Sequence, residues 1–264
     1  MRDDALQLAA RNLLGAAPCS VEMPAGTGKT HLLAAAAAAA AAEGKCSLIL
    51  THTNAGVDAI RKRIRRFGVP SGLVRVDTIT SWAFSLVRSY SKIAGVSVTE
   101  IPNWTESDVY LAGATAVARS KAVAHVHSVS FEYLFVDEYQ DCTLVLHNFV
   151  LALAAAIPKA VILGDRLQAI FTFAGPMTSW DEHVVPRFPT YAMSVTPHRW
   201  TNHNPDLGRW LLAIRPHLQH GEIFDFAAHM VPGLRFIESR QPAVLGTVAH
   251  SFRNFNESVL LLDK

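Results

Sequence analysis

The sequence predicts an α/β fold in which helices cover both faces of a parallel sheet. Short apolar runs alternate along the chain with longer segments whose apolar residues recur at helical spacing. The glycine-rich stretch PAGTGKT lies between the first apolar run and a helix, and a later apolar run ends abruptly in acidic residues. Strands that alternate with helices favour parallel pairing through crossover helices.

The expected elements follow from these patterns along the chain. Nine consecutive alanines, residues 34–42, extend the helix after PAGTGKT towards Gly44, and Val57, Ile60 and Ile64 mark the next helix. We expect strands at 20–23, 46–51, 74–76, 131–136, 160–163, 191–195, 234–237 and 258–262, and helices at 31–43, 54–66, 78–90, 144–156 and 207–214.

The composition is typical of a folded protein without disulfide bonds. Half of the 264 residues are hydrophobic, and 24 Lys and Arg against 22 Asp and Glu give a net charge of +2, which neither requires nor excludes nucleic acid. Cys19, Cys46 and Cys142 are far apart and show no CxxC spacing. This pattern argues against a disulfide framework or a zinc site and is typical of a reducing cytosol.

No targeting or membrane segment is visible in the sequence. Arg2, Asp3 and Asp4 open the chain without an apolar signal-peptide region. The longest apolar stretch, residues 32–42, is too short to cross a bilayer and is nearly all alanine, which favours a helix. We therefore expect a cytoplasmic protein with no membrane partner.

PAGTGKT has the residues that a phosphate-binding loop needs. Gly26 and Gly28 let the backbone curl so that several N–H groups converge on phosphate oxygens, in front of the positive end of a helix. The Lys29 side chain can reach the β- and γ-phosphates, and the Thr30 hydroxyl can bind Mg²⁺. The strict pattern has glycine where this chain has Met23.

The stretch VDEYQD places carboxylates at the end of a buried strand, where they are costly without a positive partner. If this strand lies beside the phosphate-binding loop, Asp137 can hold Mg²⁺ opposite Thr30, and Glu138 can act as the general base that activates water. The alternative is an acidic strand end in a solvated loop.

A third stretch, GDRLQAIFTF, places Gln168 where its amide can contact the γ-phosphate. Phe171 and Phe173 of the same stretch either stack on bases or pack in the core.

These three stretches, in this order, resemble the UvrD/Rep-like branch of superfamily 1 DNA helicases. LTHTNA (residues 50–55) and DTITSW (77–82) are similar to the family's DNA-contacting motifs, and TPHR (196–199) is similar to its motif IV. The resemblance covers roughly residues 6–210. The compact insertion between Tyr90 and His127 is similar to that of the shorter members, including the helicase-like subunit of Gabija-type antiviral systems.

The resemblance implies a RecA-like P-loop NTPase domain that uses ATP and Mg²⁺ and contacts single-stranded DNA. Its implied catalytic residues are Glu138, Gln168 and Arg199, the last as an arginine finger, and its implied metal ligands are Thr30 and Asp137. Its implied nucleotide-binding residues are Pro24, Ala25, Gly26, Thr27, Gly28, Lys29, Thr30 and His31. Its implied DNA contacts are Thr51, Thr53, Asn54, Thr78 and Ser81.

The implied domains are a first RecA-like domain at 1–90 and 128–200, a small helical insertion at 91–127, and the truncated start of a second RecA-like domain at 201–264. The family's motifs V and VI are absent. The chain is therefore expected to be either a fragment or a natural truncation, and one domain alone cannot complete the opening and closing cycle of a helicase.

Several residues depart from the family pattern. His31 replaces the arginine that stacks on adenine, and Gln7 stands where an upstream glutamine is expected, without its usual neighbours. Adenine selectivity is therefore open. His52 replaces an aromatic residue and Ala174 replaces an arginine, which leaves DNA contact open.

Smaller features have simpler interpretations. The basic run at 61–66 can contact a phosphate backbone but is more typical of the solvated face of an amphipathic helix. His125 and His127 have metal-like spacing without a third ligand, so a structural role is favoured. Cys142 is expected to be a small buried residue.

Three functions are compatible with the sequence. The first is an ATP-dependent DNA helicase or translocase of UvrD/Rep type. The second is a nucleotide- or DNA-sensing ATPase subunit of an antiviral defence complex, with a nuclease or another defence subunit as partner. The third is an inactive fragment that only binds nucleotide. A small-molecule P-loop kinase would not account for VDEYQD followed by GDRLQ.

Overall fold

The computed structural model describes residues 2–96, 103–169, 175–225 and 228–233. The chain divides into two compact units, Met1–His203 and Asn204–Lys264. The expected strands at 234–237 and 258–262 lie outside the described residues, as do Phe171, Phe173 and Ala174.

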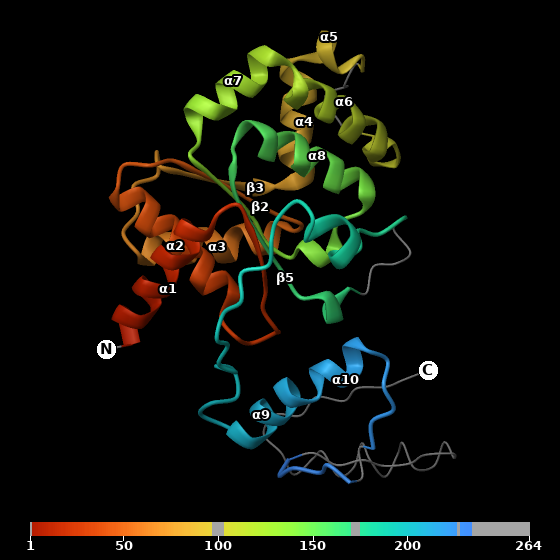
Figure 1. Ribbon diagram of the computed structural model, residues 1–264. Helices are drawn as coiled ribbons and strands as arrows, with labels where there is room; N and C mark the ends of the chain where they lie inside the picture. The colour runs from red at the N-terminus through yellow and green to blue at the C-terminus, as the bar shows by residue number, and fades with distance from the viewer. Residues whose placement is uncertain (1, 97–102, 170–174, 226–227, 234–264) are drawn as a thin grey trace. The chain divides into compact units, whose positions relative to one another are not determined.

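A five-stranded parallel sheet forms the centre of the first unit (Figure 1). The strand order is β1-β5-β4-β2-β3. All residues of β2 and β4 are buried, which accounts for their nearly continuous apolar sequences. The strands are β1 (Cys19–Glu22), β2 (Ser47–Thr51), β3 (Val74–Thr78), β4 (Tyr133–Val136) and β5 (Lys159–Gly164).

Three helices cover one face of this sheet: α1 (Arg2–Ala16), α2 (Lys29–Ala42) and α3 (Asn54–Arg66). They share one apolar cluster with side chains of the sheet such as Ile49 and Phe135. Seven of the nine alanines of α2 are buried, six of them in this cluster, because small side chains let the helix approach α1 and the sheet closely.

The opposite face is covered by the helices that follow β3 and β4 (Figure 1). Leu111 and Val117 of α6 lie in the same apolar cluster as Val87 of α4 and Phe149 of α8. The expected insertion is thus helical in its described part and packs as part of this layer. The helices are α4 (Ile79–Ser89), α5 (Ser91–Ala94), α6 (Ser107–Arg119), α7 (Lys121–Ser130) and α8 (Leu144–Ala156), with a 3₁₀ turn, η1 (Trp104–Glu106), before α6.

The prediction of a strand at 191–195 is wrong. This segment runs in extended form past β1, where Ser20 N–H donates to the Pro189 carbonyl at 2.9 Å and Tyr191 N–H donates to the Ser20 carbonyl at 2.8 Å, but it forms no continuous ladder. Tyr191, Met193 and Val195 pack against the apolar cluster of the α1–α3 face while the residues between them are exposed. Alternating burial therefore arises here without a paired strand.

The second unit contains two short helices in its described part, α9 (Pro205–Ala213) and α10 (Arg215–Gln219). The Asn204 side chain caps α9 by accepting from Leu207 N–H at 3.0 Å and also donates to the Pro232 carbonyl at 2.7 Å. The helix expected at 207–214 is confirmed. That residues 201–264 begin a second RecA-like domain stays a prediction.

The simpler interpretations of the histidine pair and of Cys142 fit the described structure. His127 is buried and its Nδ1 lies 2.9 Å from the Val123 carbonyl oxygen, whereas His125 is exposed. Cys142 is fully buried. Among the described residues, no helix has both the length and the apolar character that a membrane span requires.

Candidate nucleotide-binding and catalytic site

The glycine-rich loop, residues 24–30, leaves the carboxyl end of β1 and leads into α2. Gly26 and Gly28 have φ angles of 76° and 93°, a left-handed backbone that side chains other than glycine rarely adopt. Gly28 is the N-cap of α2, so the first N–H groups of the helix face the loop. Thr27 closes the turn, because its N–H and hydroxyl both donate to the Pro24 carbonyl, at 3.3 Å and 2.6 Å.

Met23 does not disturb this loop. Its N–H donates to the Gly164 carbonyl at 2.9 Å, which continues the β1–β5 ladder by one residue, and its side chain is buried in the core. The loop turns only after Met23, so the position where the strict pattern has glycine is here an extension of the strand.

The acidic residues of VDEYQD meet the loop directly. Lys29 Nζ lies 2.6 Å from Glu138 Oε2, and the Thr30 hydroxyl donates to Asp137 Oδ2 at 3.3 Å. Strand β4 is not the neighbour of β1, since β5 lies between them. The residues still meet because parallel strands all end at the same edge of the sheet.

Burial raises the pKa of both the Asp137 and the Glu138 carboxyl groups, and the Lys29 charge lowers both pKa values. Asp137 is 2% exposed, and burial raises its pKa to about 6 although the Lys29 charge opposes the shift. Burial also raises the pKa of Glu138, but the Lys29 charge and the hydrogen bonds from Gln140 and Lys29 outweigh it, so the net pKa is lowered. Glu138 has a φ of 56°, and strained backbone of this kind clusters at functional sites.

Thr30 and Asp137 fit a Mg²⁺ site that is completed by phosphate. Their two oxygens lie side by side, and Asp137 is deeply buried. In the described part of the chain, no group of three or more His, Cys, Asp and Glu residues is arranged to hold a metal. Mg²⁺ in nucleotide sites is held by one or two protein oxygens together with water and substrate phosphates, so a pair is sufficient.

Arg199 lies against the glycine-rich loop. The backbone N–H of Arg199 donates to the Gly26 carbonyl at 3.0 Å, and a Cβ added at Gly26 would lie 2.8 Å from Arg199 Cβ. Gln168 ends the 3₁₀ turn η3 (Arg166–Gln168), which follows β5. The contacts of these two side chains with the γ-phosphate stay predictions.

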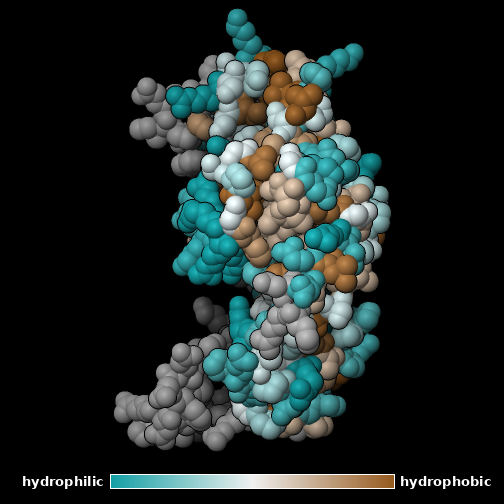
Figure 2. All heavy atoms as spheres, turned by 90° about the vertical axis from the view of Figure 1, so that its left-hand side faces the viewer, coloured by the Kyte–Doolittle hydropathy of each residue, from teal (hydrophilic) through white to brown (hydrophobic). Residues whose placement is uncertain are grey.

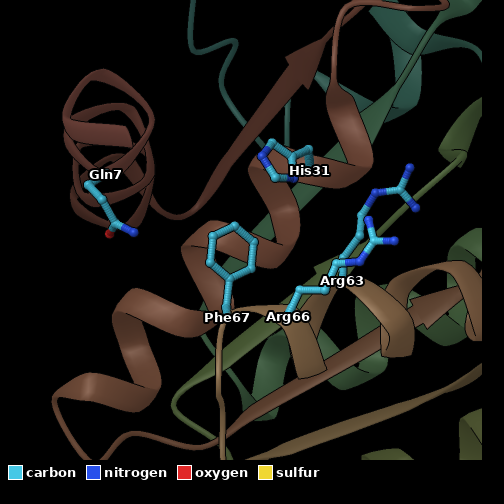
Figure 3. A pocket seen from close by; sticks show the side chains of 5 residues that line it. All are labelled: Gln7, His31, Arg63, Arg66 and Phe67. Carbon is cyan, nitrogen blue, oxygen red and sulfur yellow. The ribbon is translucent and has the colours of Figure 1, made fainter. Parts of the chain in front are cut away.

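A pocket of about 420 Å³ opens next to the start of α2 (Figure 3). Gln7 of α1 lies on one side and the guanidinium groups of Arg63 and Arg66 lie on the other, with His31 and Phe67 between them. The rings of His31 and Phe67 are 5.4 Å apart between centroids. His31 directly follows Thr30, so the pocket adjoins the glycine-rich loop.

The sequence interpretation missed three residues of this pocket. Arg63 and Arg66 belong to the basic run that was assigned to a solvated helix face, and Phe67 follows that run. The face seen in Figure 2, on the side of α1 and α3, carries hydrophilic areas beside apolar ones. Arg66 and Phe67 follow Arg63 by three and four positions, about one helical turn, and this spacing was the available signal.

The residues expected to contact DNA gather at the ends of β2 and β3. Thr51 and Thr78 are paired in register, and both are nearly fully buried. Thr53 accepts from Gly56 N–H at 3.0 Å as the cap of α3, and Asn54 beside it is exposed. Thr78 caps α4 by accepting from Ser81 N–H at 3.0 Å. Their contacts with DNA stay predictions.

Gln140 is a further residue of the site. It is 6% exposed, its Nε2 donates to Glu138 Oε2 at 2.9 Å, and its Oε1 accepts from Asp165 N–H at 3.0 Å. The sequence showed the amide within VDEYQD without indicating a role. That role depends on Asp165, which belongs to a different strand end.

A parallel sheet, a glycine-rich loop with Lys29 and Thr30, and Asp137 with Glu138 at another strand end define a P-loop NTPase fold. Residues 7–174 match the family described as the AAA domain. The match covers more than half of the 264 residues, and the chain belongs to this family. A comparison with curated proteins gave no match. The family supports a nucleotide-binding domain of ATPase type.

Proposed function

We propose that this chain is the ATP-binding and ATP-hydrolysing part of a DNA helicase or translocase of UvrD/Rep type. The observation that carries the proposal is the convergence of Lys29 and Gln140 on Oε2 of Glu138, next to the Thr30–Asp137 pair. The order of PAGTGKT, VDEYQD and GDRLQ along the chain supports the helicase type over other P-loop enzymes.

In this proposal the triphosphate lies on the N–H groups of residues 26–30. Lys29 binds the β- and γ-phosphates, and Glu138 accepts a proton from the water that attacks the γ-phosphorus. Thr30 and Asp137 would hold Mg²⁺, which supplies charge neutralisation at the phosphates. Arg199, which already contacts Gly26, stabilises the charge that develops on the γ-phosphate, and Gln168 contacts the same group.

The pocket beside α2 fits the nucleoside. A base stacked near His31 and Phe67 would lie between Gln7 and the two arginines, and the pocket volume of about 420 Å³ is within the range of small-molecule sites. Gln7 can donate and accept hydrogen bonds, so it can recognise the edge of a purine.

Single-stranded DNA is proposed to bind where β2 and β3 end. Thr53 and Asn54 offer polar groups at the start of α3, and Ser81 does so in the first turn of α4. The N-termini of two helices lie there together, because Thr51 and Thr78 are paired in register, and helix N-termini favour phosphate groups.

The test is ATP hydrolysis by the 264-residue chain with Mg²⁺, in the presence and absence of single-stranded DNA. We expect turnover that single-stranded DNA stimulates and that Lys29→Ala abolishes. Glu138→Gln should lower the rate by roughly 10²–10⁴-fold while ATP still binds, because only the general base is removed.

Three results would count against the proposal. Hydrolysis by Glu138→Gln at the parent rate would remove Glu138 as the base. If turnover is independent of single-stranded DNA and the chain does not bind DNA at low salt, the chain is an ATPase but the assignment to the helicase type is wrong. ATP binding without any turnover would favour an inactive nucleotide-binding chain.

A further inference from the structure

We infer that Gln140 is a positioning residue that fixes the Glu138 carboxylate and joins it to the turn after β5. This inference rests on the proposed function, since it assigns a role to a neighbour of the proposed base. The starting observation is the pair of hydrogen bonds of the Gln140 side chain, to Glu138 Oε2 at 2.9 Å and from Asp165 N–H at 3.0 Å.

The two partners fix the orientation of the Gln140 amide. A carboxylate can only accept a hydrogen bond and a backbone N–H can only donate one. The amide nitrogen must therefore face Glu138 and the amide oxygen must face Asp165. The reversed amide would place two acceptors against each other at Glu138 and two donors against each other at Asp165.

The side-chain amide of Gln140 packs closely against Gly164. It is 6% exposed, and a Cβ added at Gly164 would lie 2.9 Å from Gln140 Oε1 and 2.7 Å from the Trp180 ring. Gly164 therefore leaves room for the amide, and Trp180 in the π-helical turn η5 (Trp180–Val184) closes that side. A side chain packed in this way can transmit a fixed geometry to Glu138.

The role of Gln140 becomes essential when phosphate competes for Lys29. Lys29 Nζ and Gln140 Nε2 both donate to Glu138 Oε2, and among the described residues they are the two side chains that do so. A triphosphate on the loop draws Lys29 towards its own oxygens. Gln140 then keeps Oε2 in place, and Oε1, to which neither side chain donates, faces the attacking water.

The second bond connects this carboxylate to the turn that carries Gln168. Asp165 is the N-cap of η3, and its side chain accepts from Leu167 N–H at 3.2 Å. The path from Glu138 through Gln140 and Asp165 thus joins the proposed base to the proposed γ-phosphate contact. A shift of the turn changes the position of the base.

Gln140→Glu and Gln140→Leu separate the two hydrogen bonds. Gln140→Glu keeps an acceptor for Asp165 N–H but removes the donor to Glu138, whereas Gln140→Leu removes both. If Gln140 positions Glu138, both variants lower kcat about 10–100-fold and leave the KM for ATP nearly unchanged. Gln140→Met, which is uncharged and similar in length to glutamine, removes the donor without the like-charge repulsion that Gln140→Glu adds beside Glu138, and it should lower kcat by a similar factor.

If Gln140 only supports the turn after β5, Gln140→Glu keeps the parent kcat and only Gln140→Leu loses activity, which would overturn the inference. Loss of ATP binding in both variants would also overturn it. Crystal structures of the parent and Gln140→Leu, which adds no charge beside Glu138, give a test that is independent of turnover. The Glu138 carboxylate should move away from its place beside Lys29, and an unchanged carboxylate would refute the inference. A parent without turnover would instead count against the proposed function.

Discussion

Gly26 shows how a single residue serves both the loop and its neighbour. Its φ of 76° permits the tight turn, and its missing side chain leaves room for Arg199, whose Cβ would lie 2.8 Å from an added Cβ. We predict that Gly26→Ala strains the backbone by about 1–2 kcal/mol and also displaces Arg199. Equilibrium titration should show ATP binding that is at least about tenfold weaker.

Gly44 provides the matched control for this variant. Its φ is 72°, and nothing lies within 4 Å of an added Cβ. Gly44→Ala should lower the stability by a similar amount and leave ATP affinity unchanged. Equal ATP affinities for both variants would mean that the contact between Gly26 and Arg199 is unimportant for the nucleotide.

The individual residues of the site were predictable to different degrees. Lys29, Thr30, Asp137 and Glu138 occur in dense local patterns, and the structure brings them within hydrogen-bond distance. Gln140 was not predictable in its role, because one of its partners is 25 positions away along the chain. Local patterns identify chemistry that is close in sequence, whereas support from a distant strand requires the fold.

The alanine-rich helix α2 carries a prediction at the scale of elements. Ala37 is fully buried in the apolar cluster that α2 shares with α1 and the sheet, whereas Ala38 beside it is partly exposed. Ala37→Leu should overpack the core and lower the free energy of unfolding by about 1–3 kcal/mol. Ala38→Leu, which adds the same atoms to the same helix, should change it by less, and chemical denaturation measures both. Equal losses would contradict close packing of α2.

The packing of α8 predicts a dependence of stability on pH. Burial and, to a smaller extent, the nearby charges of His183 and Arg187 lower the pKa of His147 to about 4. An unfolded histidine has a pKa near 6.5. Between these values the unfolded chain binds more protons, so stability is fully present above about pH 6.5 and falls as the pH decreases towards 4.

His147→Gln tests this dependence, since glutamine does not titrate and can still bond to the Tyr139 hydroxyl, which lies 2.8 Å from His147 Nδ1. The slope of unfolding free energy between pH 6.5 and 4 should decrease by up to about 1.4 kcal/mol per pH unit. His52 and His127, whose pKa values burial also lowers, leave a residual slope. An unchanged slope in His147→Gln would show that His147 titrates normally.

Elements with caps and clear periodicity were predicted well. The bounds 54–66 and 144–156 agree with α3 and α8, because Thr53 and Thr143 cap these helices with their side chains. The prediction of a strand at 191–195 was wrong. Alternating apolar residues indicate that one face of the segment is buried, but they do not indicate that another strand pairs with it. The absence of ladder bonds along a chain segment cannot be read from its sequence.

The whole first unit places its functional groups at one edge of the sheet. The fold class was predictable from alternating strands and helices, but the position of β5 between β1 and β4 was not. That arrangement places the Gly164–Asp165 strand end between the glycine-rich loop and Asp137, where Gln140 connects the strand ends. Ligands of open parallel sheets bind at the carboxyl ends of the strands, as the site here requires.

The most direct test of the account is equilibrium binding of ATP, with Mg²⁺, to the parent chain, Lys29→Ala and Glu138→Gln. The account predicts that Lys29→Ala weakens binding by roughly 100-fold or more, which corresponds to about 2.7 kcal/mol. Glu138→Gln should bind at least as tightly as the parent, because it releases Lys29 from its ion pair. Equal affinities of the parent and Lys29→Ala, or no binding by the parent, would contradict the assignment of this site.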